Sequence, residues 1–277
     1  RVWVRYRTVI TQLFGKSAVS NKPELLTVAR LAPFLMEPLQ RAFTVHERLH
    51  EAGADAAAFE RIAPSIRAIC GSGESKVSAE LIAKLPALEI ISIMGVGYDG
   101  VDVAAAKARG VMVGHTPDVL NDDVADLALA LMLNIARRIP QADAYVRAGK
   151  WPGGPMPLAR KMSGARLGVV GMGRIGQAIA QRALAFGMSV AYTARSAKAD
   201  LPFAFYPTPQ ALAAASDFLV VITPGGAATR KLIDADVLRA LGPDGYLVNV
   251  ARGSVVDETA LIAALQQGTI AGAAPMT

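Results

Sequence analysis

A glycine-rich loop between a predicted strand and a predicted helix constrains the fold of this 277-residue chain more than any other feature. The apolar run at residues 167–170 predicts a buried strand, and the motif GMGRIG follows at once at residues 171–176. The pattern after the motif predicts a helix over residues 177–186 and a second strand over residues 188–192. A GxGxxG motif alone is weak evidence, but within a strand–loop–helix–strand unit it is typical of a dinucleotide-binding site.

The three glycines of the motif have different physical roles in such a site. Gly171 permits a tight turn, Gly173 lets the backbone approach a pyrophosphate, and Gly176 lets the helix pack close to the strand. The helix N-terminus adds N–H groups and a favourable dipole for the phosphates. An ordinary glycine-rich turn is the alternative interpretation. We assign cofactor binding to these residues of the loop: Gly171, Gly173, Arg174, Ile175 and Gly176.

The residues after the second strand predict which dinucleotide is preferred. Sites for NAD place Asp or Glu there to bind the ribose 2′-hydroxyl. This sequence instead reads YTARS at residues 192–196 and has no acidic residue before Asp200. The guanidinium of Arg195 suits a 2′-phosphate, and the hydroxyl of Ser196 can donate beside it. We therefore expect NADP to be preferred over NAD, the alternative being that Arg195 is a solvated surface residue.

Composition excludes several other classes of protein. With 52% hydrophobic and 19% charged residues, the chain is not mainly disordered. No run reaches 18 uninterrupted apolar residues, so we propose no transmembrane helix. The single cysteine, Cys70, excludes a disulfide scaffold and a multi-cysteine zinc site. It also fits a reducing compartment, so we expect a cytoplasmic protein without a metal site.

The net charge of +6 is concentrated at the N-terminus. Residues 1–30 contain six Lys and Arg against Glu24 alone, whereas the other 247 residues contain 23 basic and 22 acidic side chains. A nearly neutral body does not support a nucleic-acid-binding surface. The basic extension at residues 1–21 is interpreted either as a targeting peptide or as additional upstream sequence.

Short apolar runs alternate with helical patterns along most of the chain, which favours βαβ units and parallel sheets. A long helix predicted over residues 122–148 and a Gly/Pro-rich loop at residues 149–157 interrupt this alternation and are expected to form a hinge. The domains expected are residues 22–118 and residues 119–277, with the linker helix in the second. The strands expected before the hinge lie at residues 25–29, 66–70, 88–94 and 111–113, and the helices at residues 34–43, 78–84 and 103–109.

Two further strands of the dinucleotide unit end in chemically informative residues. The strand expected at residues 217–222 runs into Thr223 and Pro224, and the strand at residues 245–250 runs into Ala251 and Arg252. Ligands of open α/β sheets bind beyond the carboxyl ends of the strands, so Arg252 is expected near the nicotinamide. An arginine there can bind a substrate carboxylate and polarise the adjacent carbonyl. A capping or salt-bridging arginine is the alternative.

Four motifs occur in one order along the chain: MGVGYD at residues 94–99, TPDV at 116–119, GMGRIG at 171–176 and NVARG at 249–253. Together they resemble the D-2-hydroxyacid dehydrogenases, most closely the glyoxylate/hydroxypyruvate reductase branch, over about residues 23–274. The resemblance implies an α/β fold of two Rossmann-like domains. Residues 22–118 would form a flavodoxin-like substrate domain, and residues 119–277 an NAD(P)-binding Rossmann domain.

The resemblance also implies an activity and a set of site residues. Family members transfer hydride between a nicotinamide and C2 of a small 2-keto acid, and they are usually homodimers. By this resemblance the N–H groups of Val96 and Gly97 bind the substrate carboxylate, and Arg252 is the catalytic arginine. Pro224 and Val250 match positions that line the cofactor cleft.

The sequence departs from the family pattern at its end. Relatives continue after Ala274 with a Leu-Asp-Val-Phe strand, a catalytic Glu and a catalytic His, whereas this chain reads PMT at residues 275–277. We therefore expect a C-terminally incomplete fold with little or no turnover. A non-catalytic dinucleotide-binding regulator on the same scaffold is the alternative function. None of the three histidines matches the missing acid: His46, His50 and His115.

Overall fold

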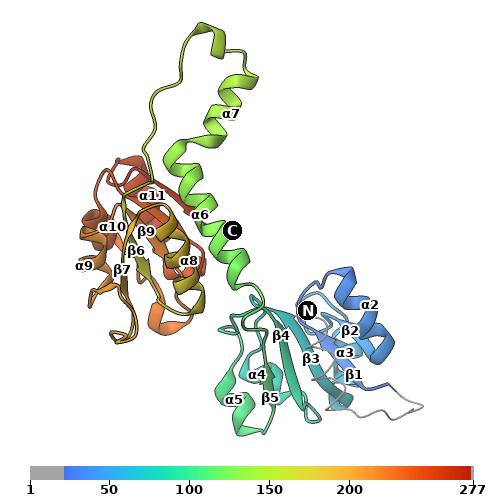
Figure 1. Ribbon diagram of the computed structural model, residues 1–277. Helices are drawn as coiled ribbons and strands as arrows, with labels where there is room; N and C mark the ends of the chain where they lie inside the picture. The colour runs from blue at the N-terminus through green and yellow to red at the C-terminus, as the bar shows by residue number, and fades with distance from the viewer. Residues whose placement is uncertain (1–21, 276–277) are drawn as a thin grey trace. The chain divides into compact units, whose positions relative to one another are not determined.

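The computed structural model describes residues 22–275 and shows an α/β protein built around two parallel sheets (Figure 1). The chain divides into two compact units, Arg1–Val119 and Leu120–Thr277. The basic extension expected at residues 1–21 lies outside the described residues. The expectation of an α/β protein with two separate sheets is confirmed.

The first unit has a five-stranded sheet in the order β2-β1-β3-β4-β5, with every neighbouring pair parallel. This is the flavodoxin-like order, in which the chain reverses direction across the sheet between β1 and β3. The elements are β1 (Glu24–Thr27), α2 (Pro33–Ala42), β2 (Thr44–Glu47), α3 (Ala56–Ile62), η1 (Ala63–Ser65), β3 (Ile66–Ser72), α4 (Ala79–Ala83), β4 (Ile90–Met94), α5 (Val103–Ala108) and β5 (Met112–Gly114).

Neighbouring residues of these strands alternate between two buried clusters, one on each face of the sheet. Leu26 packs in a cluster with side chains of α3, α4 and α5, whereas Leu25 packs in a second cluster with side chains of α2. The sequence did not predict β2 or α3. The strand β2 reads TVHE and has no buried residue, so it lacks the apolar run by which the other strands are recognised.

The second unit has a six-stranded parallel sheet in the order β11-β10-β9-β6-β7-β8, which is the strand order of the dinucleotide-binding Rossmann fold. Helices α6 and α8 contribute to the buried cluster on one face, and α9, α10 and α11 to the cluster on the other. Its elements are α6 (Asn121–Arg137), α7 (Ile139–Arg147), η2 (Trp151–Gly153), β6 (Arg166–Val170), α8 (Arg174–Ala185), β7 (Ser189–Thr193), β8 (Ala204–Phe205), α9 (Pro209–Ala214), β9 (Phe218–Val221), η3 (Ala227–Thr229), α10 (Ala235–Leu241), β10 (Tyr246–Asn249), η4 (Gly253–Val255), α11 (Glu258–Gln266) and β11 (Gly272–Pro275).

The long helix expected over residues 122–148 is two helices, α6 and α7. They are separated by Arg138, whose φ of 54° is left-handed. The cause is Pro140, which has no N–H to continue the α6 hydrogen-bond ladder and whose ring would clash with the preceding turn. Helix α6 buries Leu129 and Met132 in the core of the second unit, and the division between the two units falls before it, at Val119.

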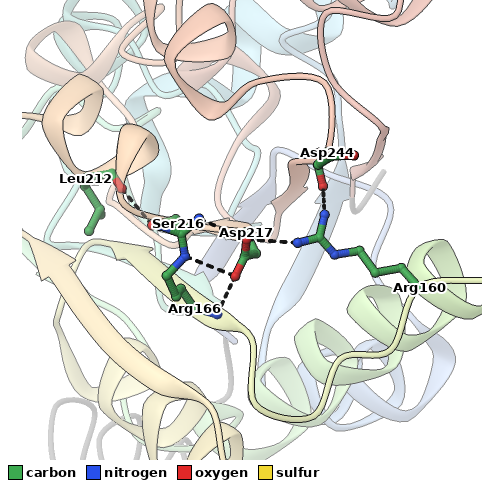
Figure 2. A network of polar contacts seen from close by, with 6 residues as sticks. All are labelled: Arg160, Arg166, Leu212, Ser216, Asp217 and Asp244. Atoms are coloured by element: carbon green, nitrogen blue, oxygen red, sulfur yellow. Dashed lines mark hydrogen bonds and ion pairs between the residues drawn. The ribbon is translucent and has the colours of Figure 1, made fainter.

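A network of polar contacts joins the amino-terminal ends of three neighbouring strands in the second unit (Figure 2). The carboxylate of Asp217 accepts hydrogen bonds from the backbone N–H of Arg166 at 2.8 Å and from the Arg160 guanidinium at 2.9 Å. Arg160 also donates to the carbonyl of Asp244. These contacts hold together the starts of β6, β9 and β10, at the edge of the sheet opposite to the carboxyl ends of its strands.

We expect Asp217→Asn to lower the free energy of unfolding by about 2 kcal/mol at neutral pH, because charge-assisted hydrogen bonds to arginine are lost. The hydrogen bond from Arg166 holds the pKa of Asp217 below its usual range. The Asp217 carboxylate therefore contributes its full stabilisation when the pH is above the pKa that Asp217 has in the unfolded chain. This stabilisation is lost as the pH falls through the lower pKa that Asp217 has in the folded protein. Urea unfolding should thus show a difference in the free energy of unfolding between variant and wild type, and this difference should become smaller at acidic pH. Asp244→Asn is the control, since Asp244 contacts Arg160 through its backbone carbonyl, which the substitution keeps. A difference in the free energy of unfolding that does not depend on pH would contradict the prediction.

Candidate functional site

The helix α8 begins inside the glycine motif, at Arg174, three residues earlier than expected. Gly173 is its N-cap residue, so the residues of the motif from Arg174 onward form the first helical turn. A Cβ added at Gly173 would meet no atom within 4 Å. The backbone here is therefore open to a ligand, and the first N–H groups of a 12-residue helix point toward it.

Gly171 and Gly176 are required by the protein's own packing. Gly171 has a φ of +107°, and a Cβ there would lie 2.7 Å from the carbonyl oxygen of Ile222. A Cβ at Gly176 would lie 2.2 Å from the carbonyl oxygen of Gly171. Both distances are far below van der Waals contact, so only glycine lets β6, α8 and the end of β9 approach this closely.

Arg195 and Ser196 follow the end of β7, directly beside the glycine loop. The N–H of Gly171 donates to the carbonyl of Thr193 at 2.9 Å, which joins the two loops. Both Arg195 and Ser196 are exposed. The buried Tyr192 anchors this segment, because its hydroxyl accepts a hydrogen bond from the backbone N–H of Lys198 at 2.7 Å. Sequence reasoning missed Tyr192, although a tyrosine at the end of a buried strand often has a partner for its hydroxyl.

The end of β9 contributes a buried hydroxyl to the same edge. Thr223 Oγ1 is buried and has no hydrogen-bond partner among the described residues. Pro224, which follows it, is exposed, and its carbonyl accepts from the hydroxyl of Thr229 at 2.7 Å. A buried polar atom without a partner is costly in a folded protein. This hydroxyl, the open backbone at Gly173 and the start of α8 fit a bound dinucleotide.

The loop after β10 is shaped by a buried asparagine. The side-chain amide of Asn249 donates to the carbonyl of Arg252 at 2.9 Å and accepts from the N–H of Ala251 at 3.0 Å. Val250 is buried, and its N–H donates to the carbonyl of Val221 at 3.0 Å. Asn249 therefore bridges both sides of the turn that leads to Arg252, which is half-buried. The sequence motif contained Asn249, but its role is visible only in the structure.

Lys231 supports the arginine loop, the segment after β10 that contains Arg252, through contacts to residues that follow Arg252. The N–H of Lys231 donates to the carbonyl of Ser254 at 2.8 Å, and its ammonium lies 3.1 Å from the carboxylate of Asp257. The hydrogen bond from Lys231 lowers the pKa of Asp257, which also caps α11 through the N–H of Ala260. The segment after Arg252 is thus held at both ends.

Sheet order brings the predicted cofactor residues of the second unit to one edge. The strands β10, β9, β6 and β7 are consecutive neighbours and parallel, so the loops after their carboxyl ends lie side by side. Every predicted residue of this unit lies in or directly after one of these loops: Gly171, Gly173, Arg174, Ile175, Gly176, Arg195, Ser196, Pro224, Val250 and Arg252.

In the first unit, the turn after β4 presents two backbone N–H groups. Gly95 has a φ of +147°. It is held by Thr116, whose N–H donates to the Gly95 carbonyl at 2.9 Å and whose hydroxyl accepts from the Gly95 N–H at 2.9 Å. Val96 and Gly97 are half-buried, and within the described residues their N–H groups have no acceptor. Two adjacent donors of this kind can bind a carboxylate.

The three histidines lie in the first unit. His46 lies in β2, with its Nε2 atom 2.6 Å from the carboxylate of Glu24. His50 follows β2, and burial lowers its pKa. His115 follows β5, and its Nδ1 atom lies 2.9 Å from the carbonyl oxygen of Val96. Only His115 contacts a predicted site residue.

Residues 22–275 contain no cluster of three or more His, Cys, Asp or Glu side chains arranged to bind a metal ion. Over the same residues, every helix is too short or too polar to cross a membrane.

Comparisons with known proteins identify relatives that match most of this chain. The family model for the NAD binding domain of D-isomer specific 2-hydroxyacid dehydrogenases matches residues 129–275. The 2-ketogluconate reductase of Gluconobacter oxydans is 45% identical over 255 residues, which are 92% of this chain and 81% of that protein. The glyoxylate/hydroxypyruvate reductase A of Arabidopsis thaliana is 47% identical over 210 residues, which are 76% of this chain and 67% of that protein.

A solved structure with a bound cofactor is also similar. It is the NADPH-dependent glyoxylate/hydroxypyruvate reductase of Sinorhizobium meliloti in complex with NADP and malonate. It has 44% sequence identity and a TM-score of 0.84, with 92% of this chain and 79% of that chain covered.

Proposed function

Because the chain belongs to the D-isomer specific 2-hydroxyacid dehydrogenase family, we propose that it reduces small 2-keto acids of the glyoxylate or hydroxypyruvate type to 2-hydroxy acids. The observation that carries this proposal is the single sheet edge at which the glycine loop, the Arg195 loop and the Arg252 loop lie side by side. In this proposal residues 22–118 form the substrate domain and residues 119–277 the NAD(P)-binding domain.

The second unit would hold the dinucleotide through its backbone more than its side chains. The first turn of α8 and the open backbone at Gly173 would receive the pyrophosphate, and Arg195 with Ser196 the 2′-phosphate of NADP. Pro224 and Val250 would line the cleft for the rest of the cofactor. NADPH, once bound, supplies the hydride that reduces the keto carbon.

The substrate would be held by its carboxylate. We propose that the N–H groups of Val96 and Gly97 and the guanidinium of Arg252 bind this group. An arginine bound to the carboxylate also polarises the adjacent keto carbonyl, because its positive charge stabilises the negative charge that develops on the oxygen. The overall reaction takes up one proton at that oxygen and one hydride at C2.

The direct test follows NADPH oxidation by the purified chain with hydroxypyruvate and with glyoxylate, alongside calorimetric titration with NADPH. Saturable turnover of either keto acid supports the proposal. NADPH binding without turnover would agree either with the little or no turnover expected in the sequence analysis or with the non-catalytic dinucleotide-binding regulator considered there. Failure to bind NADPH would contradict both functions.

Arg195→Ala should weaken NADPH binding by at least tenfold and leave NADH binding nearly unchanged. The physical reason is that Arg195 is exposed and would contact only the 2′-phosphate, which NADH lacks. Fluorescence titration with both cofactors measures the two affinities. Arg230→Ala, an arginine in the loop after β9, is the control. Equal losses for NADPH and NADH in the Arg195 variant would refute the assignment.

We also propose that the protein forms a homodimer through the arm that comprises α7 and the loop after it, residues 139–160. This arm projects from the rest of its unit (Figure 1), and α7 has no buried residue. Large apolar side chains on it are exposed, including Trp151 at 63% and Leu158 at 100%. Their exposure fits a surface that a second copy covers.

The double variant Trp151→Glu and Leu158→Glu should convert a dimer to a monomer, because each change would bury a charge in the interface. Sedimentation velocity measures the oligomeric state. Ile262→Glu is the matched control, since Ile262 is 49% exposed but lies on α11, outside residues 139–160. A dimer that persists in the double variant would refute this interface.

A cytoplasmic location is the remaining proposal. It is supported by cysteine usage: the single cysteine, Cys70, is a buried free thiol, and disulfides are rare in cytoplasmic proteins. Cell fractionation with a tagged chain tests the location.

A further inference from the structure

The turn after β4 is oriented by contacts to its carbonyl groups. In a trans peptide the C=O and the following N–H point in opposite directions within one plane, and the described residues contain no cis peptide. The Val96 carbonyl and the Gly97 N–H belong to one such plane, and the Gly95 carbonyl and the Val96 N–H to the plane before it. A donor that binds either carbonyl therefore sets the direction of the N–H on the opposite side.

Both carbonyls have such a donor, and the two donors are consecutive residues. The backbone N–H of Thr116 donates to the Gly95 carbonyl, and the His115 ring nitrogen Nδ1 lies 2.9 Å from the Val96 carbonyl oxygen. A carbonyl only accepts, so Nδ1 of His115 carries the hydrogen. The first contact is backbone to backbone and does not depend on residue type. The second depends entirely on the side chain of His115.

The His115 ring is itself held in place. Its centroid lies 4.8 Å from that of Tyr98 in an edge-to-face arrangement with an interplanar angle of 61°. Tyr98 directly follows Gly97, so the ring spans the turn from the Val96 carbonyl to the side chain after Gly97. This arrangement limits the rotation of the ring and of the peptide that it contacts.

We propose that His115 is a positioning residue for substrate binding: its Nδ1–H holds the Val96 carbonyl and thereby aims the Gly97 N–H at the substrate carboxylate. The bond also polarises the peptide, which makes its N–H a stronger donor. His115 takes no part in proton transfer in this role. The inference rests on the proposed function, because it assumes that the turn binds a carboxylate.

Three substitutions at position 115 separate this role from a general effect on folding. His115→Ala removes the donor. His115→Asn keeps one, because the Asn side-chain nitrogen occupies nearly the position of the His Nδ1 atom. His115→Asp has a similar shape to Asn but offers only acceptors, so it repels the Val96 carbonyl and adds a negative charge beside the carboxylate.

The readout is malonate binding to the whole chain saturated with NADP, measured by calorimetry and by the NMR shift of the Gly97 N–H in ¹⁵N-glycine-labelled protein. We expect His115→Ala to weaken malonate binding about fivefold, as the loss of one hydrogen bond implies. His115→Asn should restore it to within about twofold of wild type, and His115→Asp should weaken it more than Ala. NADP affinity should stay unchanged in all three, and thermal stability should stay unchanged in the Asn variant.

Two results would overturn the inference while leaving the proposed function intact. One is unchanged malonate affinity in His115→Ala, and the other is an Asn variant that binds no better than the Ala variant. A third result would overturn both: a Gly97 N–H signal in the wild-type chain that does not respond to malonate. The wild-type titration therefore distinguishes failure of the carboxylate site from failure of the positioning role.

Discussion

Gly176→Ala is expected to lower the free energy of unfolding by about 3 kcal/mol, the upper end of the range for overpacked sites. The added methyl carbon would lie 2.2 Å from the carbonyl oxygen of Gly171, and this obstacle is backbone, which cannot rotate away as a side chain can. Either α8 must move off β6 or the loop must open. Urea unfolding followed by circular dichroism measures the loss.

Gly173→Ala, in the same motif, is the matched control. Its φ of −78° is one that alanine adopts, and an added Cβ meets nothing within 4 Å. Its stability should stay within about 0.5 kcal/mol of wild type, while its NADPH affinity falls at least tenfold because the methyl group occupies the approach of the pyrophosphate. If the two variants lost stability equally, the packing argument for Gly176 would be wrong.

Arg252→Ala is expected to reduce turnover of hydroxypyruvate by about 10²–10³-fold, the usual cost of removing a group that stabilises a developing oxyanion. The effect should appear in kcat as well as KM, since the arginine both binds the carboxylate and polarises the carbonyl. Arg252→Lys should recover only part of the loss, because an ammonium cannot form the paired hydrogen bonds of a guanidinium. Steady-state kinetics with NADPH measures both constants.

Malonate binding gives the same test of Arg252 without relying on turnover, and it too should weaken in the Ala variant. Arg239→Ala is the control, since Arg239 pairs with Asp236 on the exposed surface of α10. NADPH affinity should be unchanged in both variants. Malonate affinity and turnover that survive in Arg252→Ala would exclude this residue from the substrate site.

The glycine motif could be interpreted from the sequence because each position depends on local geometry. A left-handed φ at Gly171 and a close helix–strand contact at Gly176 both require glycine, and both are present. The first residue of α8 could not be predicted as accurately from the sequence. Its N-cap is Gly173, which makes no side-chain cap, so the sequence carried no capping signal there.

The break between α6 and α7 shows a different limit. Pro140 is visible in the sequence, but the pattern over residues 122–148 predicts one long helix. The structure resolves the conflict with a single left-handed residue, Arg138, which ends one helix and precedes the next. A proline inside a helical pattern therefore outweighed the pattern.

By itself, the sequence determined the two parallel α/β sheets, the glycine loop and the arginine loop, because periodicity and residue-specific backbone geometry are local properties. The tertiary structure alone decided which side chains, far apart in the sequence, hold the turn after β4 and the starts of the strands β6, β9 and β10. His115 contacts the carbonyl of Val96, 19 residues away, and Arg160 contacts Asp217, 57 residues away. Such contacts depend on strand order and register, which bring distant residues together at a sheet edge and which no local pattern encodes.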